Sequence, residues 1–350
     1  MKLLVITQKV DQNDDLLGFF HGWIYEFANC AEKVTVVALG VGEYHLPENV
    51  KVLSLGKEAG QSKLKYLFRF YKYIWSERKN YDTVFAHMNK EYVIMGGLLW
   101  RLTGKKIGLW YVHKEVSFQL RLAELLANII FTSSEESFNL PSKKLKIIGH
   151  GIDLEQFSYS PRPDHRENFR IIYVGRISRI KNQKLLIEAI NFLVNKNSIK
   201  NIKVDLVGSP VYQDDQVYQD ELIWIIKSNK LENYINFCGS VPHKDIAEVY
   251  QRADLSVNLC PTGGMDKAVL ESMAGGLPVI LLNETFANIL ENYKSDLILT
   301  KASEFELAEK IIRLREMAED KKLQMTKNLK AIVNEQYDIK KLIGRIINSY

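Results

Sequence analysis

Residues 260–280 combine the residue types that bind a nucleoside diphosphate. They read CPTGGMDKAVLESMAGGLPVI, so a glycine-containing loop runs into an amphipathic helix and then, through a glycine turn, into an apolar strand. Unpaired backbone N–H groups and the positive end of the helix dipole at Gly264, Asp266 and Lys267 suit phosphate. Glu271, about two helical turns further on, can accept from the two hydroxyls of a ribose. The segment predicts a nucleotide diphosphate site, although glycine loops also occur in α/β turns for steric reasons alone.

A second set of charged residues follows an apolar strand predicted at residues 170–174. Gly175 and Arg176 come directly after this strand, and Lys181 follows five residues later, before a helix. Arginine offers a planar fork and lysine a point charge, and both suit a diphosphate at the carboxyl end of a strand. The other interpretation is a pair of solvated loop cations.

These segments resemble the donor site of glycosyltransferase family 4, which comprises retaining enzymes of the GT-B fold also called glycosyl transferases group 1. The family pattern is Glu-Gly-Phe-Gly, four residues, then Glu-Ala-Met-Ala-x-Gly-x-Pro-Val. The chain keeps the second glutamate as Glu271, but Gly263 stands at the first glutamate and Met265 at the phenylalanine. The first glutamate normally contacts the donor sugar, so Asp266, one helical turn away, is the candidate for supplying the missing carboxylate.

The resemblance covers about residues 170–299 and implies further donor contacts. The family's Gly-Arg-x-x-x-x-Lys-Gly holds the donor diphosphate, and Arg176 and Lys181 match it by spacing, with Asn182 in place of the glycine. Gly208 follows the next strand. The segment after it matches the family at Gly239, Val241, Pro242, Tyr250, Ala253 and Asp254. The resemblance implies a main-chain contact of Val241 with the nucleobase, whereas Tyr250 and Ala253 are expected to be packing residues.

The first domain offers fewer candidates. Gly18, in LLGFFHGW, either lets the backbone approach the donor phosphates or simply starts a helix. His113 follows the apolar run IGLWYV, so we expect it at the carboxyl end of a strand, facing the cleft, where the resemblance implies that it positions or polarises the donor sugar. His87 occupies a similar strand end and is a second candidate. The aspartates before Gly18 are an acidic loop or acceptor ligands.

Residues 63–79 read KLKYLFRFYKYIWSERK, and both their basic and their apolar side chains recur at the spacing of a helix. Basic residues form one stripe, at Lys65, Arg69, Lys72 and Lys79. Apolar residues form another, at Leu64, Leu67, Phe68, Tyr71, Ile74 and Trp75. Such a helix can lie on an anionic bilayer. The alternative is an ordinary domain helix that buries its apolar face and solvates its charges.

Composition excludes several classes of protein. The 350 residues are 46% hydrophobic and 25% charged, which is typical of soluble globular proteins, and no apolar run approaches a membrane span. Three scattered cysteines predict neither disulfides nor a zinc site, and fit a reducing cytoplasm. The net charge of +5 permits an anionic partner, and no nucleic-acid motif is present.

Short apolar runs alternate with helical patterns, which predicts two doubly wound, Rossmann-like α/β domains facing a central cleft. We expect an acceptor-side domain at residues 1–160, a nucleotide-sugar domain at 161–335, and a final helix at 336–350 that crosses back to the first domain. The predicted strands are residues 3–6, 34–39, 50–55, 83–86, 108–112, 129–132 and 146–148, then 170–174, 203–207, 235–238, 255–258, 278–282 and 297–299. A polar, proline-containing linker is expected at 158–168, and helices at 304–318 and 340–347.

The sequence and the resemblance together predict a retaining hexosyltransferase-like enzyme of cell-envelope or exopolysaccharide biosynthesis. It would move a sugar from a UDP- or GDP-sugar to a glycan or lipid-linked acceptor, in the cytoplasm or peripherally at the inner face of the plasma membrane. The chain contains no Asp-x-Asp motif, so we expect it to need neither metal nor cofactor. A GT-B sugar-nucleotide epimerase and a catalytically silent nucleotide-sugar-binding subunit are the alternatives.

Overall fold

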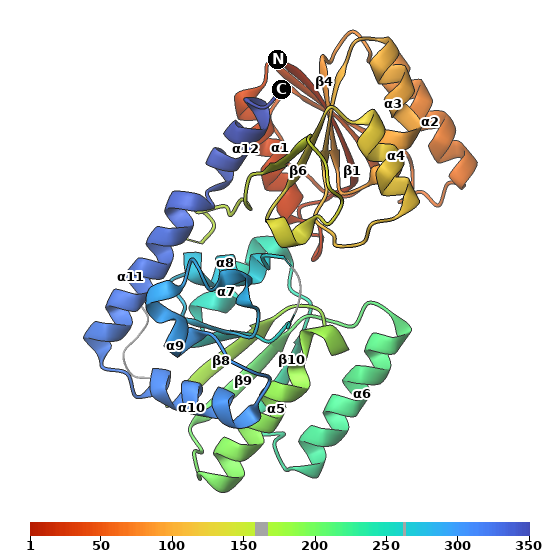
Figure 1. The fold of residues 1–350 in the computed structure, drawn as a ribbon. Helices are drawn as coiled ribbons and strands as arrows, with labels where there is room; N and C mark the ends of the chain where they lie inside the picture. The colour runs from red at the N-terminus through yellow and green to blue at the C-terminus, as the bar shows by residue number, and fades with distance from the viewer. Residues whose placement is uncertain (158–166, 262–263) are drawn as a thin grey trace. The chain divides into compact units, whose positions relative to one another are not determined.

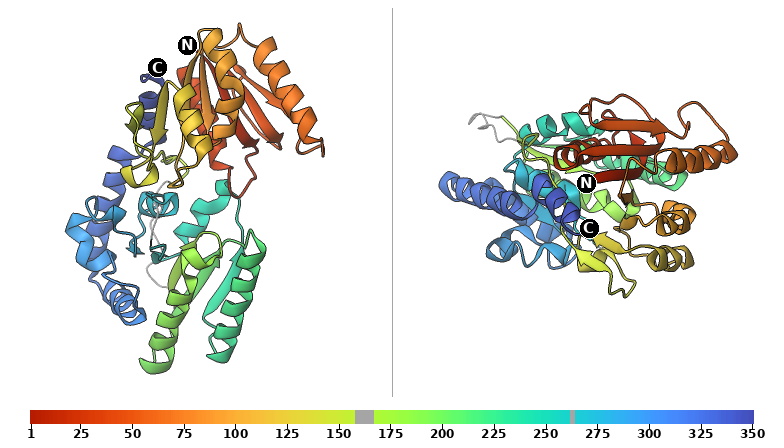
Figure 2. Two further views of the ribbon diagram at one scale, coloured as in Figure 1. Left: turned by 45° about the vertical axis from the view of Figure 1, so that its right-hand side comes forward. Right: turned by 90° about the horizontal axis from the view of Figure 1, so that it is seen from above.

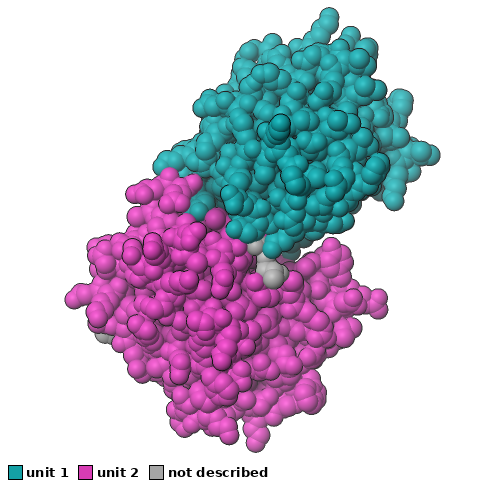
Figure 3. Space-filling view, in the orientation of Figure 1, with its two compact units in different colours: residues 1–153, 242–244, 337–350 teal, residues 154–241, 245–336 magenta. Residues whose placement is uncertain are grey.

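The computed structural model describes residues 1–157, 167–261 and 264–350, which divide into two compact α/β units (Figure 1, Figure 3). Unit 1 consists of residues 1–153, 242–244 and 337–350, and unit 2 of residues 154–241 and 245–336. Gly263 and most of the linker expected at 158–168 lie outside the described residues.

Unit 1 is built on a seven-stranded sheet with the order β3-β2-β1-β4-β5-β6-β7, in which every pair of neighbours is parallel. Leu3, Leu4, Val5 and Ile6 of β1 are all fully buried, because helices cover both faces of a parallel sheet. The strands are β1 (Lys2–Val10), β2 (Lys33–Val41), β3 (Val50–Ser54), β4 (Thr83–His87), β5 (Lys106–Trp110), β6 (Ile129–Thr132) and β7 (Leu145–Ile147).

Helices on the two faces of this sheet form two separate apolar cores. Figure 1 and Figure 2 show α2, α3 and α4 on one face, and α1 with the C-terminal helix α12 on the other. The final segment of the chain thus packs against the first helix within unit 1. The helices are α1 (Phe19–Cys30), α2 (Lys63–Ser76), α3 (Lys90–Leu102), α4 (Phe118–Leu126) and α12 (Ile339–Ile347).

Unit 2 has a five-stranded parallel sheet with the order β10-β9-β8-β11-β12. Its strands are β8 (Phe169–Val174), β9 (Ile202–Val207), β10 (Ile235–Gly239), β11 (Leu255–Asn258) and β12 (Val279–Leu281). Its helices are α5 (Gln183–Asn191), α6 (Gln213–Ser228), α7 (Ile246–Gln251), α8 (Lys267–Ala274), α9 (Lys294–Leu297), α10 (Glu304–Arg315) and α11 (Glu319–Gln336).

The α/β prediction is confirmed, and three expectations about individual elements are wrong. Residues 297–299 do not form a strand, because α9 runs to Leu297 and only Ile298 makes a bridge, to Leu281. Strand β5 ends at Trp110, two residues earlier than expected. The helix expected at 304–318 ends at Arg315, and the polar helix α11, whose low hydrophobicity hid it, follows.

Each sheet has one point at which the direction of strand addition reverses. In unit 1 the chain builds β2 and β3 on one side of β1 and then crosses to β4 on the other side; in unit 2 it builds β9 and β10 beside β8 and then crosses to β11. Loops leave adjacent strands in opposite directions at such a point, so a crevice opens at the carboxyl ends of the strands. The ends of β1 and β4, and of β8 and β11, are therefore the places to look for ligand sites.

Candidate functional site

An ion pair joins the two loops at the reversal point of unit 2. Lys181 ends a short 3₁₀ turn (Arg179–Lys181) after β8, and Asp266 precedes α8 after β11. The Lys181 ammonium donates to the Asp266 carboxylate, and Asn258 Nδ2, at the end of β11, donates to the same Asp266 oxygen at 3.0 Å. Only 22% of the Lys181 side chain and 21% of the Asp266 side chain are exposed. The crevice thus carries one fixed, paired cation.

Burial opposes the charge on both partners, but the pairing outweighs it. Desolvation raises the pKa of Asp266. The Lys181 charge and the hydrogen bonds from Asn258 and Ala268 lower it by more, so the net pKa lies below its ordinary value. Desolvation lowers the pKa of Lys181, and Asp266 raises it to a net value above the ordinary one. Both groups are therefore ionised at neutral pH.

Asp266 also begins helix α8. Its second oxygen, Oδ1, accepts from the backbone N–H of Ala268 at 3.2 Å, so the carboxylate serves as the N-cap. The carboxylate predicted to contact the donor sugar is thus held by Lys181, by Asn258 and by the helix at the same time. This arrangement fixes its position at the mouth of the crevice.

Arg176 lies on the same loop as Lys181, and the repulsion between the two positive charges lowers the pKa of Lys181. Its Nε is 3.7 Å from Asp215 Oδ2, and its guanidinium lies over the Tyr212 ring at 5.3 Å. The Arg176 carbonyl accepts from Gln183 Nε2 at 2.9 Å, which ties the loop to α5. These contacts hold the guanidinium in place, with a third of the side chain still exposed.

Two glycines allow the loops after β8 and β9 to touch. Gly175 and Gly208 have φ values of +153° and +141°. A Cβ at Gly208 would lie 2.1 Å from the Gly175 carbonyl oxygen, which no side chain permits. The predicted donor contact at Gly208 is therefore a position that only glycine can occupy, directly beside Arg176.

The remaining candidates of the α8 segment lie close to this cluster in sequence. Glu271 is buried in α8, with Oε1 3.9 Å from Lys267 Nζ one turn earlier. The Gly264 carbonyl accepts from Asn283 Nδ2 at 3.1 Å, and Met265 is half-buried. Val241 lies after β10, half-buried and outside any helix or strand.

The candidates of the first domain belong to unit 1. Gly18 immediately precedes α1, and a Cβ there would lie 2.3 Å from the Asp14 carbonyl, so a close turn requires the glycine. His113 is exposed in a loop, three residues beyond β5 rather than at its end, and its Nδ1 accepts from the Glu115 N–H at 3.1 Å. His87 ends β4 but is buried, stacked on Phe20 with 3.9 Å between ring centroids. A part for His113 or Gly18 in donor binding stays a prediction.

Sequence reasoning missed two side chains that hold the cluster. Asn258 is the last residue of β11. Asp215 lies in the first turn of α6, where it accepts from the backbone N–H groups of Val211 and Tyr212. A polar residue closing a buried strand beside the glycine loop was the available signal for Asn258. Asp215 offered none, because acids are common in first turns.

Comparisons with known proteins identify the fold and a family that the second half of the chain resembles. Residues 168–317 match the family model for glycosyl transferases group 1. Over its whole length the chain superposes on HepE of Anabaena in complex with UDP-glucose, with a TM-score of 0.76, 18% identity and full coverage of both chains. It also superposes on sucrose-phosphate synthase of Thermosynechococcus elongatus, with a TM-score of 0.73, 14% identity and coverage of 99% and 98%. The predicted GT-B fold is confirmed.

Curated relatives agree with this assignment. The UDP-Gal:alpha-D-GlcNAc-diphosphoundecaprenol alpha-1,3-galactosyltransferase of Escherichia coli is 24% identical over 340 residues, 89% of this chain and 84% of that enzyme. Alpha-monoglucosyldiacylglycerol synthase of Acholeplasma laidlawii is 29% identical over 154 residues, 44% of this chain and 36% of that enzyme. The curated relatives are named glycosyltransferases and residues 168–317 match the group 1 model, so the chain is a glycosyltransferase.

The ion pair at the crevice predicts a measurable loss of stability. Asp266→Asn keeps the size of the side chain but leaves the Lys181 ammonium without its counter-charge, so we expect unfolding at pH 7 to cost about 2 kcal/mol less than in the wild type, below the full value for a buried pair. Because folding lowers the pKa of Asp266, its contribution is present at neutral pH and is lost as pH falls through the folded pKa. The difference between the two proteins should therefore shrink below about pH 4.

Urea unfolding at several pH values measures this difference. Glu248→Gln is the control, because it removes the same charge from an exposed pair with Arg252, and exposed pairs contribute less than about 1 kcal/mol. Equal losses in both variants would show that the Lys181–Asp266 pair has no special weight.

Proposed function

We propose that this glycosyltransferase transfers a sugar from a nucleoside diphosphate sugar, of the UDP type, to a lipid-linked or glycan acceptor, with retention of anomeric configuration and without a metal ion. The observation that carries the proposal is the cluster of Arg176, Lys181 and the start of α8 at the reversal point of unit 2. It offers two cations and a helix N-terminus to one diphosphate.

The proposed reaction breaks the bond between the anomeric carbon and the diphosphate, so negative charge builds on the leaving group. Arg176, Lys181 and the amides around Gly264 and Lys267 would stabilise that charge. An ammonium has three N–H donors, so Lys181 can bind a phosphate oxygen while it keeps Asp266. The charge that another enzyme takes from a metal would thus come from side chains.

The other proposed roles follow the predicted contacts. Glu271 would accept from the ribose hydroxyls, and Asp266, held at the mouth of the crevice, from a hydroxyl of the donor sugar. Main-chain groups at Gly208 and Val241 would line the base and phosphate path. His113 and Gly18 would act from unit 1, with His113 positioning the sugar and the leaving phosphate helping to deprotonate the acceptor.

The names of related proteins support the proposed classes of sugar donor and acceptor. The solved HepE complexes contain UDP, glucose and UDP-glucose. The Escherichia coli relative is named for UDP-galactose, a diphosphoundecaprenol acceptor and an α-1,3 product, and UDP-galactose itself carries an α-linked sugar. Further relatives are named for colanic acid and amylovoran biosynthesis. These names favour a UDP-sugar donor, retention, and a lipid-linked acceptor in the synthesis of a cell-surface glycan.

The diphosphate clamp predicts two variants with weak nucleotide binding. Arg176→Ala and Lys181→Ala should each lower UDP affinity and transfer at least about tenfold, because each removes a charge-assisted contact worth about 1.5–3 kcal/mol. Calorimetry with UDP measures the affinities. Arg179→Ala is the matched control, since Arg179 lies on the same turn but is largely exposed and pairs with Glu221 at 2.8 Å. Unchanged affinity in both clamp variants, or an equal loss in the control, contradicts the assignment.

Metal removal tests the charge stabilisation. Within the part of the chain that the structure describes, no three His, Cys, Asp or Glu side chains are grouped so as to hold a metal ion. Transfer should therefore continue at an unchanged rate in excess EDTA. Complete loss of transfer that manganese restores would refute this part of the mechanism.

The outer face of α2 suits a membrane surface. Leu64, Phe68, Tyr71 and Trp75 recur at intervals of four, three and four residues, and all are exposed, while Phe70 and Ile74 are buried against the sheet. The apolar stripe predicted from the sequence is thus mostly not part of the core. Among the residues described, no helix has the length and apolarity to cross a bilayer.

Basic residues flank this stripe, so we propose that α2 lies on an anionic bilayer. Lys65, Lys72 and Lys79 are exposed. Arg69 is half-buried instead and donates to the Leu55 carbonyl at 3.1 Å, so it helps to hold the helix on unit 1. The helices α3 and α4, which cover the same face of the sheet as α2, also expose large apolar side chains: Leu98, Leu102, Phe118 and Leu125. Such a surface gains from both apolar burial and attraction to lipid headgroups.

Liposome sedimentation tests the membrane proposal. The protein should sediment with phosphatidylglycerol vesicles, not with phosphatidylcholine vesicles, and salt should release it because surface charges are screened over about 8–10 Å. Glutamate at Lys65, Lys72 and Lys79 should abolish sedimentation. The same change at the exposed residues Lys196, Lys321 and Lys327 of unit 2 is the matched control and should not. Equal behaviour of the two triple variants would refute the proposal.

A further inference from the structure

Two cavities of similar size lie side by side in unit 1, at the carboxyl ends of its central strands. One has a volume of about 690 Å³ and the other about 680 Å³, and both are lined by Gln8 and Asn89. Gln8 is on β1, and Asn89 follows β4, so the two residues flank the reversal point of the sheet. Neither cavity is lined by Arg176, Lys181 or Asp266, the donor cluster that we propose for the nucleotide sugar.

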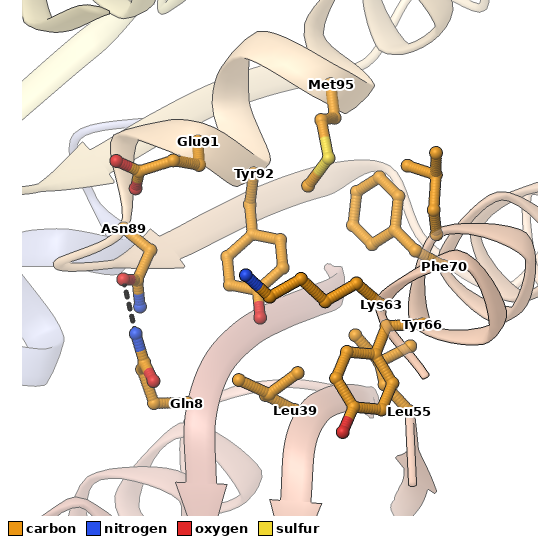
Figure 4. A pocket seen from close by; sticks show the side chains of 11 residues that line it. Gln8, Leu39, Leu55, Lys63, Tyr66, Phe70, Asn89, Glu91, Tyr92 and Met95 are labelled. Carbon is orange, nitrogen blue, oxygen red and sulfur yellow. Dashed lines mark hydrogen bonds between the residues drawn. The ribbon is translucent and has the colours of Figure 1, made fainter. Parts of the chain in front are cut away.

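The first cavity is mainly apolar. Figure 4 shows its apolar side chains on one side, Gln8, Asn89 and Glu91 on the other, and the Lys63 side chain between these groups. The apolar and aromatic lining includes Leu39, Leu55, Tyr66, Phe70, Tyr92 and Met95. Within the described parts of the chain, Lys63 takes part in no ion pair. The cavity therefore suits a hydrocarbon chain that ends in an anion.

The second cavity is lined by charged groups of both signs. Lys9, Asp14, Lys57 and Glu58 come from the loops after β1 and β3 or from β1 itself. Asp14 is paired with Lys9 at 2.6 Å, whereas the described residues offer Lys57 no carboxylate partner. Glu58 accepts from Ser54 Oγ at 2.6 Å and from the Val41 N–H at 3.2 Å. Fixed carboxylates with free lone pairs suit the hydroxyl groups of a sugar.

A hydrogen bond joins the two residues that line both cavities. Gln8 Nε2 donates to Asn89 Oδ1 at 2.7 Å (Figure 4). Gln8 is exposed and Asn89 is half-buried, so solvent reaches the bond and it can exchange for bonds to a ligand at small cost. A molecule with an apolar end and a polar end could therefore lie across both cavities.

We propose that these cavities form one bipartite site for an anionic amphiphile: the apolar cavity holds the hydrocarbon next to a phosphate, Lys63 binds the phosphate, and the charged cavity receives the attached sugar. This assignment rests on the proposed function, because it locates the lipid-linked acceptor. The ligand that we propose is a sugar joined through phosphate or diphosphate to a long hydrocarbon chain.

The position of α2 supports a lipid rather than a free sugar. Lys63, Tyr66, Leu67 and Phe70 line the apolar cavity from α2. The outer face of the same helix carries the exposed apolar stripe that begins at Leu64. Leu67 is 40% exposed and contributes to the lining, so the cavity opens at the edge of that stripe. A hydrocarbon chain could pass from a bilayer into the cavity beside Leu67.

Binding of farnesyl phosphate, measured by calorimetry below its micellar concentration, tests the site without relying on catalysis. Leu67→Trp should narrow the apolar cavity where it opens and weaken binding at least about tenfold, a loss of about 1.4 kcal/mol. Leu64→Trp is the matched control: it makes the same change three residues earlier, at a side chain that is 79% exposed and outside the lining, and should bind like the wild type. Thermal unfolding verifies that each variant is folded.

Lys63→Gln separates the phosphate contact from the apolar contact. Lys63 is exposed, so this variant should fold even if Leu67→Trp does not. It should weaken binding of farnesyl phosphate about fivefold and leave binding of farnesol unchanged, because farnesol has no charge. Glu58→Gln, in the other cavity, should not weaken binding of farnesyl phosphate.

The site is refuted if the wild type does not bind farnesyl phosphate, if Leu67→Trp and Leu64→Trp lose the same affinity, or if Lys63→Gln affects farnesol and farnesyl phosphate equally. UDP binding and sugar transfer are measured separately on the same variants. Farnesyl phosphate binding without any transfer would sink the proposed function and leave the site standing. Transfer to a lipid-linked acceptor that Leu67→Trp does not impair would sink the site alone.

Discussion

The reversal of strand order in each parallel sheet is the constraint on which both candidate sites depend. It occurs between β8 and β11 in unit 2 and between β1 and β4 in unit 1. Parallel strands all end at the same edge, so every loop that follows a strand starts at that edge. The same geometry brings together the donor cluster in unit 2 and the side chains that line the two cavities in unit 1.

Electrostatics at the donor cluster follow from that placement. Lys181 is brought into a half-enclosed crevice, where a lone charge would be costly, and Asp266 and Asn258 come from the neighbouring strand's loop to offset the cost. The same carboxylate caps α8, so the lysine, the helix N-terminus and the acid are fixed together. A diphosphate would therefore meet donors that are already oriented, which is the arrangement that favours stabilisation of a leaving group.

Unit 1 divides its helices between two tasks. The inner sides of α2, α3 and α4 bury aromatic and aliphatic residues against the sheet, while their outer sides keep large apolar residues exposed. The outer apolar stripe of α2 adds nothing to the core, so a structural need does not explain it. A surface that contacts lipid and a cavity that opens beside it give one account of both features, in which the acceptor reaches the enzyme from the bilayer.

The sequence by itself determined the α/β class and most of the strands, because apolar periodicity is a local property. It could not reveal that Asp266 meets Lys181, 85 residues away, because that contact depends on strand order. Asn258, the polar residue that closes β11 before the glycine loop, was a signal that sequence reasoning did not use. It placed His113 at a strand end, but β5 stops earlier. Only the tertiary structure decided which apolar residues of α2 are buried, because one amphipathic pattern fits either a core or a membrane, and the packing of α2 on the sheet selects Phe70 and Ile74.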